Sequence, residues 1–250
     1  MRRQFEKQLE TLHNNLICMG ALCEDAIASA SKALLDEDDA LREKAIFLEQ
    51  DINLIERDLE QMCVRLLLHQ QPMASDLRRI TAAQGMIVDM ERIGDQAADI
   101  AELSKFMKGS SVKSDVHIAE MARATIKMVT ESIDSFVKEN PKQAKAVIDY
   151  DDVVDDLFSK VKEELIATLI NDSSPTSGSI AGGSIADGSP TSGSIADGSL
   201  ASDGLASDTL DLLMIAKYFE RIGDHAVNIA EWVLYSITGN RDKGVVGEVQ

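Results

Sequence analysis

The sequence predicts an all-α protein in which six long helices form two tandem three-helix bundles. Apolar residues recur with the period of an α-helix through most of the chain. Aromatic residues make up only 4% of the chain, and the overall composition is that of packed helices. The motif ERIGDQAADIAE at 91–102 recurs as ERIGDHAVNIAE at 220–231, with nine of its twelve positions identical. A motif that occurs once in each half predicts an internal duplication.

Helix-breaking residues divide the periodic sequence into its six predicted helices. Pro72 stops the second helix, and we expect Ser75 to cap the third by accepting a backbone N–H. Asn140 and Pro141 make a turn, and Gly239 ends the last helix. The short connections predict antiparallel neighbours. The predicted helices cover residues of about 4–35, 39–69, 75–106, 114–139, 141–170 and 207–239.

The repeated motif falls on the third and the sixth predicted helix and sets the domain boundaries. We expect a first three-helix repeat at 1–108, a second at 112–239 and a flexible C-terminal tail at 240–250. Glu49 and Asn53 of the second helix have weaker counterparts in Asp151 and Asp155 of the fifth. The two copies are expected to pack side by side about a pseudo-twofold axis.

A low-complexity insert at 171–208 interrupts the second repeat between its last two helices. It contains no aromatic residue, no Lys and no Arg, and SPTSGSIA occurs in it at 174–181 and again at 189–196. Repetition of Ser, Gly, Ala and Asp is typical of a flexible connection. We assign the insert no function and expect it to alter the first turns of the sixth helix.

The formal net charge of −18 disfavours some classes of binding partner. Nucleic-acid binding and anionic membrane surfaces are disfavoured, because both depend on Lys and Arg meeting phosphate groups. Cations or a basic protein surface fit this charge better. The first residues lack the apolar segment of a signal peptide, and no apolar run is long enough to cross a membrane. The three cysteines form no C-x-x-C pair. We therefore expect a cytoplasmic protein without direct membrane insertion.

The repeated motif places its carboxylates on one side of a helix. Each residue of an α-helix advances about 100°, so Glu91, Asp95 and Asp99 fall within a stripe about 80° wide. Ile93 and Ile100 fall on the opposite side, where a core is expected. Small residues of the motif would let a neighbouring helix approach closely. Like charges four residues apart cost a helix about 0.2–0.5 kcal/mol per pair, so this stripe requires either solvent or a bound cation.

The stripe predicts a metal site in each repeat, since the acidic residues keep the same register in both copies. Carboxylate oxygens suit hard cations, and the metal stays open among magnesium, manganese, calcium, iron and zinc. Residues of the adjacent helices are weaker candidates: Glu49, Asn53, Asp151 and Asp155. The main candidate ligands are Glu91, Asp95, Asp99, Glu220, Asp224 and Asn228.

Two alternatives to metal binding stay open. The stripe can be a solvated acidic face, or part of a helical scaffold that docks a basic partner directly without metal. Arg92 and Arg221 can also pair with acids on adjacent helices, which would give the motif a purely structural role.

Nothing in the sequence indicates an enzyme. A carboxylate-bridged di-iron oxidase of the ferritin type needs two Glu-x-x-His pairs, and only Glu10 and His13 have that spacing. A phosphate-binding P-loop, an H-E-x-x-H motif and a G-x-S-x-G motif are all missing from the sequence.

The two ERIGD motifs, the turn QQPMASDLR at 70–78 and the segment NIAEWVLYSITGN at 228–240 resemble those of the PhoU family. The resemblance covers nearly the whole chain outside the insert, which departs from the family's short connection. It implies a cytoplasmic protein of two three-helix bundles, often a homodimer, that binds metal ions or multinuclear clusters through its E-x-x-x-D motifs.

The resemblance also implies a function. PhoU-like proteins are negative regulators of phosphate uptake that link the phosphate ABC transporter to its two-component signalling pathway. The implied partners are the ATPase subunit of the transporter and the phosphate-sensing histidine kinase.

Overall fold

The structure is a computed structural model, and it describes residues 2–69, 72–114, 116–172 and 197–240. Apart from one 3₁₀ turn, η1, its regular elements in this part of the chain are α-helices, as the sequence predicts. No helix of the described part is long and apolar enough to cross a membrane. The elements are α1 (Arg2–Asp36), α2 (Asp39–His69), α3 (Ala74–Ser104), η1 (Ser111–Ser114), α4 (Ile118–Val137), α5 (Pro141–Asp149), α6 (Asp151–Asp172) and α7 (Asp197–Thr238).

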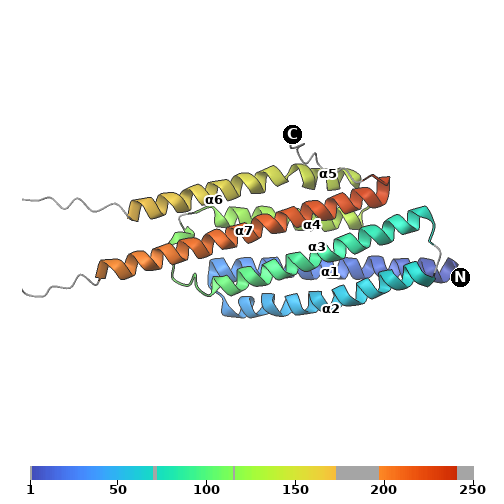
Figure 1. The fold of residues 1–250 in the computed structure, drawn as a ribbon, viewed down its shortest axis with the longest axis horizontal. Helices are drawn as coiled ribbons and strands as arrows, with labels where there is room; N and C mark the ends of the chain where they lie inside the picture. The colour runs from blue at the N-terminus through green and yellow to red at the C-terminus, as the bar shows by residue number, and fades with distance from the viewer. Residues whose placement is uncertain (1, 70–71, 115, 173–196, 241–250) are drawn as a thin grey trace, which may run out of the picture.

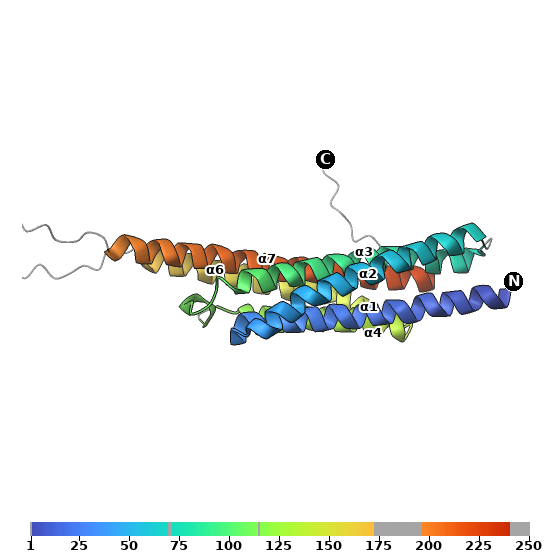
Figure 2. The same ribbon diagram turned by 90° about the horizontal axis from the view of Figure 1, so that it is seen from below.

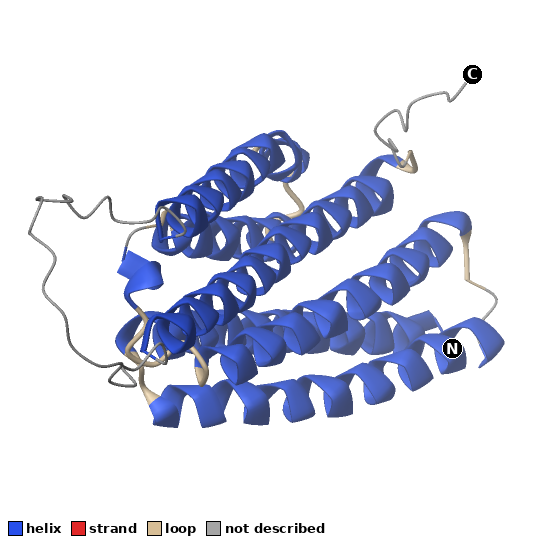
Figure 3. Cartoon of the chain, turned by 60° about the vertical axis from the view of Figure 1, so that its left-hand side comes forward, coloured by secondary structure: helices blue, strands red, loops and turns tan. Residues whose placement is uncertain are grey.

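The helices form two bundles that lie side by side along one long axis (Figure 1). Helices α1, α2 and α3 pack against one another, and α4, α5 and α6 all pack against α7. Helices α3 and α7 run antiparallel through the middle of the molecule, where the two bundles meet (Figures 1 and 3). Seen from below, α1 and α4 also lie beside each other across this junction (Figure 2). The predicted pair of tandem helical bundles is therefore confirmed.

Three local predictions need correction. The predicted fifth helix is two helices, because the chain breaks at Tyr150 between α5 and α6. Helix α7 begins at Asp197, inside the expected insert, whereas 173–196 and the tail beyond Asn240 lie outside the described residues. Ser75 does not cap α3: the cap position is Met73, which makes no side-chain hydrogen bond to the helix. The exact domain boundaries stay a prediction.

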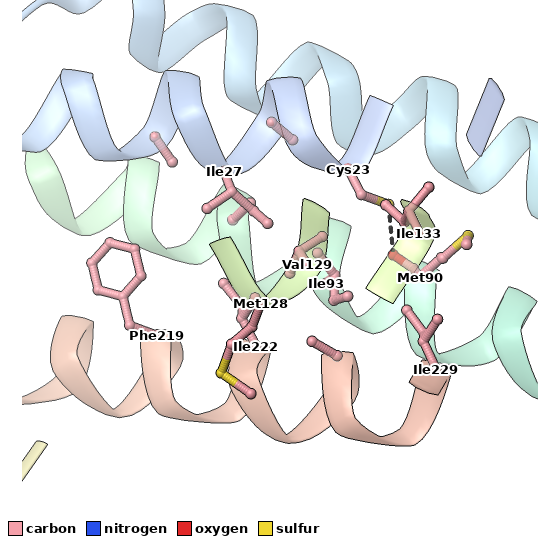
Figure 4. Close-up of a cluster of buried hydrophobic side chains, with 14 of the residues drawn as sticks. Cys23, Ile27, Met90, Ile93, Met128, Val129, Ile133, Phe219, Ile222 and Ile229 are labelled. Carbon is pink, nitrogen blue, oxygen red and sulfur yellow. Dashed lines mark hydrogen bonds between the residues drawn. The ribbon is translucent and has the colours of Figure 1, made fainter. Parts of the chain in front are cut away.

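The cores of the two bundles contain one hydrogen bond each at equivalent positions. In the first bundle, the Cys23 thiol on α1 donates to the Met90 carbonyl on α3, over 3.3 Å (Figure 4). In the second, the Thr125 hydroxyl on α4 donates to the Phe219 carbonyl on α7, also over 3.3 Å. Met90 and Phe219 each precede the repeated ERIGD motif. This correspondence supports the internal duplication.

The apolar side of each motif packs into this core, as the helix pattern predicts. Ile93 and Ile222 are fully buried. The motif glycines allow the close approach expected of small residues: a Cβ on Gly94 would lie 2.9 Å from the Ile52 side chain of α2. A Cβ on Gly223 would lie 3.4 Å from Val154 of α6. The acidic sides of α3 and α7 therefore face α2 and α6, respectively.

Gly85 permits the tightest contact between α3 and α7. A Cβ built on Gly85 would lie 2.0 Å from Cε2 of the Trp232 indole, which packs directly on the glycine backbone. The rigid indole is half-buried and packed against the core, so it cannot move aside without disturbing its neighbours.

We expect Gly85→Ala to lower the free energy of unfolding by about 1–3 kcal/mol, because overpacking outweighs the roughly 1 kcal/mol gain in helix propensity. Urea unfolding followed by circular dichroism measures this change. Gly204→Ala is the matched control, since a Cβ at Gly204 on α7 meets nothing within 4 Å. The control should be neutral or stabilising. Equal effects of the two substitutions would contradict the tight contact.

Candidate metal centres

The second bundle contains an acidic cluster formed by Asp151 and Asp155 of α6 with Glu220 and Asp224 of α7. Burial raises the pKa of Asp151 to about 6, and repulsion from Asp155 and Asp224 adds to the shift. Burial and then repulsion from Glu220 likewise raise the pKa values of Asp155 and Asp224. The raised pKa values of Asp151, Asp155 and Asp224 show that this site favours a proton or a cation.

The first bundle contains the corresponding acidic cluster, formed by Glu49, Asn53 and Glu56 of α2 with Glu91 and Asp95 of α3. Burial raises the pKa of Glu49, and repulsion from Asp95 is the next cause. Burial also raises the pKa of Glu91, again followed by repulsion from Asp95. Close carboxylates of this kind repel one another, and a proton or a cation relieves the repulsion. This cluster therefore also favours a bound positive charge.

The donor chemistry of the clusters fits a hard cation. The Asn53 amide nitrogen donates to Glu49, while the Asn53 Oδ1 atom is buried and has no hydrogen-bond partner among the described residues. An unpaired buried acceptor beside carboxylates is a position that a cation would stabilise. In the described part of the chain, however, no three His, Cys, Asp or Glu side chains are arranged to hold a metal ion. Binding would therefore require the carboxylates to change rotamer.

The basic residues of the motifs lie at the edges of these clusters. Arg92 forms ion pairs within its own helix, to Glu91 over 3.4 Å and to Asp95 over 3.3 Å, and its side chain is 55% exposed. Lys217 pairs with Glu220 over 2.5 Å and lies over the Phe158 ring. The Arg92 guanidinium is exposed, so its pairs contribute little stability. Each of the two basic residues offsets only part of the acidic charge of its cluster.

Asp99 and Asn228 do not join the clusters but bridge α3 and α7. Tyr218 of α7 donates a hydrogen bond to Asp99, whose pKa is raised mainly by burial. The Asn228 amide donates to Asp89 of α3 over 3.1 Å. Asp89 and Tyr218 each lie two positions before a copy of the motif. Their partners, Asn228 and Asp99, each lie eight positions after the first Glu of the other copy. The two bridges therefore occupy equivalent positions relative to the two copies of the motif.

Asp89 accepts two further contacts at this junction. Its Oδ1 atom lies 2.9 Å from Nδ1 of His225, and its Oδ2 atom accepts a hydrogen bond from the Trp232 indole over 3.2 Å. The Asp89 side chain is only 11% exposed. A buried carboxylate with three partners on the opposite helix fixes the register of the two bundles.

The sequence predictions missed Glu56, Lys217 and the Asp89 network. Glu56 lies one helical turn beyond Asn53, at i+3 from it, so helix spacing alone could have placed it with the cluster. Asp89 precedes the motif by two residues and has Tyr218, not an acid, as its counterpart. No repeated pattern therefore marked Asp89 in the sequence.

Comparison with known proteins identifies this arrangement. The sequence model of one family, described as the PhoU domain, matches residues 16–104, 118–184 and 194–233. The chain belongs to the PhoU family.

Relatives within the PhoU family align over nearly the whole chain. The phosphate-specific transport system accessory protein PhoU homolog of Pseudomonas aeruginosa is 30% identical over 239 residues, which are 95% of this chain and 86% of that protein. PhoU of Escherichia coli is 27% identical over 247 residues, which are 98% of this chain and 90% of that protein. The crystal structure of PhoU from Pseudomonas aeruginosa has a TM-score of 0.79 at 29% identity and covers 94% of this chain and 100% of that chain.

A more distant structure confirms the fold alone. The phosphate transport system regulatory protein PhoU from Streptococcus pneumoniae matches with a TM-score of 0.75 at 23% identity. It covers 95% of this chain and 98% of that chain. The two-bundle architecture of the PhoU family is thus retained at low sequence identity.

We expect Asp89→Ala to lower the free energy of unfolding by about 1–3 kcal/mol, because it leaves half-buried donors on α7 without their acceptor. Tyr218→Phe removes the equivalent bridge and should cost about 1 kcal/mol. Urea unfolding at neutral pH measures both changes. Asp58→Ala, at an exposed position of α2, is the control. An Asp89 variant as stable as the control would show that the network does not hold the bundles together.

We expect Asp151→Asn to stabilise the metal-free protein at pH 7 by on the order of 1 kcal/mol after screening by solvent. The pKa of Asp151 is raised from 3.8 to about 6, so the folded protein binds a proton more tightly than the unfolded chain. Stability of the wild type should therefore rise as the pH falls from about 7 towards 4, and the variant should flatten this dependence.

Thermal unfolding in the presence of a chelator measures this effect of Asp151. Asp152→Asn is the control, because Asp152 lies in the same first turn of α6 but is exposed. The helix dipole stabilises the charged form of both carboxylates by about 0.3–1 kcal/mol, so both substitutions lose this contribution. The difference between the two variants therefore measures the repulsion within the cluster. A loss of stability in the Asp151 variant alone would contradict the repulsion.

Proposed function

We propose that the chain is a non-enzymatic, cytoplasmic regulator of phosphate uptake that binds metal ions in its two acidic clusters. In this role it acts as an adaptor between the phosphate ABC transporter and a two-component signalling pathway, and it represses the response to phosphate starvation. The relatives that align over most of the chain are named as accessory proteins of phosphate-specific transport. Membership of the PhoU family supports the link to phosphate transport.

One observation carries the metal-binding part of the proposal: the same acidic cluster is built twice, with raised pKa values in both copies. Glu91 and Glu220 occupy equivalent positions, and their side chains are only 18% and 15% exposed. Carboxylates that served only for solubility would be left in water, where repulsion is screened. Confining them between two helices costs stability, and a bound cation would offset that cost.

The proposed adaptor role rests on the relatives that are named as accessory proteins of phosphate-specific transport. The clusters contain carboxylates without a nucleophile beside them, and His225 is held by Asp89 at the bundle junction. The proposed partners are the ATPase subunit of the transporter and the sensor kinase, with a second copy of the chain as the third. A metal that changes the rotamers of carboxylates on α2 and α6 would alter the outer surface that such partners meet.

We expect Glu91→Ala combined with Glu220→Ala to reduce the metal content of the purified protein at least tenfold without unfolding the bundles. Mass spectrometric metal analysis and circular dichroism measure the two properties after loading with manganese or iron. The control is Glu43→Ala with Glu163→Ala, which removes two exposed glutamates from α2 and α6. Wild-type protein that takes up no metal at neutral pH would overturn the metal-binding part.

The same variants test the regulatory part in the native host. Deletion of the gene should raise expression of the phosphate transporter in phosphate-rich medium, and the wild-type gene should restore repression. The cluster variant should fail to restore it at equal protein abundance, whereas the control should succeed. Unchanged transporter expression in the deletion strain would overturn the regulatory role independently of metal binding.

A second candidate function is an acidic scaffold that docks a basic partner without metal. It is favoured by the side-chain positions, since no three metal-binding side chains in the described residues are arranged around a common point. Partner binding would then weaken with added salt but survive chelation. Metal-dependent binding at constant ionic strength would exclude this alternative.

A further inference from the structure

The two acidic clusters share one face of the molecule. Helices α2, α3, α7 and α6 lie next to one another in this order and form a layer, and α1 and α4 pack against one side of it (Figures 1 and 2). The bridges between α3 and α7 set the two copies of the motif level with each other. Both clusters therefore lie near the middle of the layer, on the side that α1 and α4 leave open.

Exposed apolar side chains accompany the clusters at the same position in both bundles. Val64 follows Asn53 on α2 by eleven residues, and its side chain is 47% exposed. Ile166 follows Asp155 on α6 by the same number of residues and is 50% exposed. A single exposed apolar side chain needs no explanation, because most protein surfaces carry some. An exposed apolar side chain at the equivalent position of both copies indicates a use that both bundles share.

Helical geometry turns these side chains towards the same side as the carboxylates. At about 100° per residue, Val64 is turned by about 60° from Glu49 on α2. Ile166 is turned by the same angle from Asp151 on α6. Exposed apolar side chains of α3 and α7 lie within about 120° of the first Glu of each motif and extend the same surface. The outer face, as we call this surface, consists of the two acidic clusters with Val64, Leu77, Val88, Ile166, Leu210 and Met214.

The outer face offers negative charge and apolar surface at a fixed spacing. The eleven residues that separate Val64 and Ile166 from their clusters span about 17 Å of helix. The carboxylates of each cluster carry more charge than one basic side chain and one divalent cation together, so the face stays acidic with a metal bound. A second copy of the chain, with its own net charge of −18, would bring like charges together here. The face instead complements a partner whose basic side chains lie about three helical turns from its apolar ones.

We propose that the outer face docks a basic amphipathic helix of the transporter's ATPase subunit. The basic side chains of that helix would meet the carboxylates of a cluster, and its apolar side chains would pack on Val64 or Ile166. The inference rests on the proposed function, in which this subunit is a partner, and it assigns the surface that the partner meets. The relatives are named as accessory proteins of the phosphate-specific transport system, which favours the transporter over the kinase as the occupant.

Binding of the purified ATPase subunit from the same host, followed by biolayer interferometry, tests this surface. Val64→Lys with Ile166→Lys should weaken binding at least about tenfold, because it removes apolar contact and adds repulsion of a basic partner. Phe47→Lys with Leu54→Lys is the control: both residues are 60% exposed, and helical geometry turns them about 140–160° away from Glu49. The control should bind as the wild type does, and circular dichroism should show that both variants are folded.

The possible failures of this experiment have different meanings. Equal binding by the Val64 and Ile166 variant and the wild type would overturn the docking surface and leave the adaptor role standing. An equal loss in the control would overturn it as well, since the effect would then come from added charge anywhere on α2 and α6. A wild-type chain that does not bind the ATPase subunit would overturn the adaptor role, and the docking surface with it.

A photocrosslinker on the outer face identifies the occupant directly. Val64→Cys is made in a Cys18→Ser background, because Cys18 is the exposed native thiol, and is labelled with a thiol-directed benzophenone. Irradiation of the complex should attach it to a segment of the ATPase subunit that is rich in Lys, Arg and apolar residues, identified by mass spectrometry. The same label at Phe47→Cys should attach at least about tenfold less. A crosslink to an acidic segment, or only to a second copy of the chain, would contradict the proposal.

Discussion

The antiparallel contact between α3 and α7 is the constraint on which the rest of the structure depends. Its close approach is possible because Gly85 leaves room for the Trp232 ring. Its register is set by a buried carboxylate, Asp89, and by the equivalent bridge from Tyr218 to Asp99. With this contact fixed, the apolar side of each motif turns into the shared core, and the acidic side turns towards the outer helices. The position of both candidate metal centres thus follows from one interface.

The acidic clusters lower the stability of the folded protein at neutral pH. Repulsion among Asp151, Asp155 and Asp224 opposes folding at neutral pH, and a proton or a cation relieves it. The large core can absorb this cost, since side chains from every helix of both bundles contribute to it. A cation bound there, as proposed above, would stabilise the folded state by relieving this repulsion.

The sequence predicts the fold class, the two bundles and most carboxylates of each acidic cluster, though not Glu56, because these features follow from helical period and from duplication. Glu49 and Asp151 could be placed beside the motifs because each occupies the equivalent position on a preceding helix. The sequence does not predict the break at Tyr150, since neither proline nor glycine marks it. It also does not separate Asp99 from the cluster, because Asp99 lies at the edge of the acidic stripe and only the position of α7 decides which neighbour it meets.

Trp232 is the only tryptophan in the chain, and its indole sits where the two halves of the molecule meet. Its ring covers Gly85, and its N–H is bound to Asp89. Any sliding of α3 along α7 would change both the polarity around the ring and the bond at its nitrogen. The protein therefore carries its own optical reporter, whose emission would register a shift between the halves without any added dye.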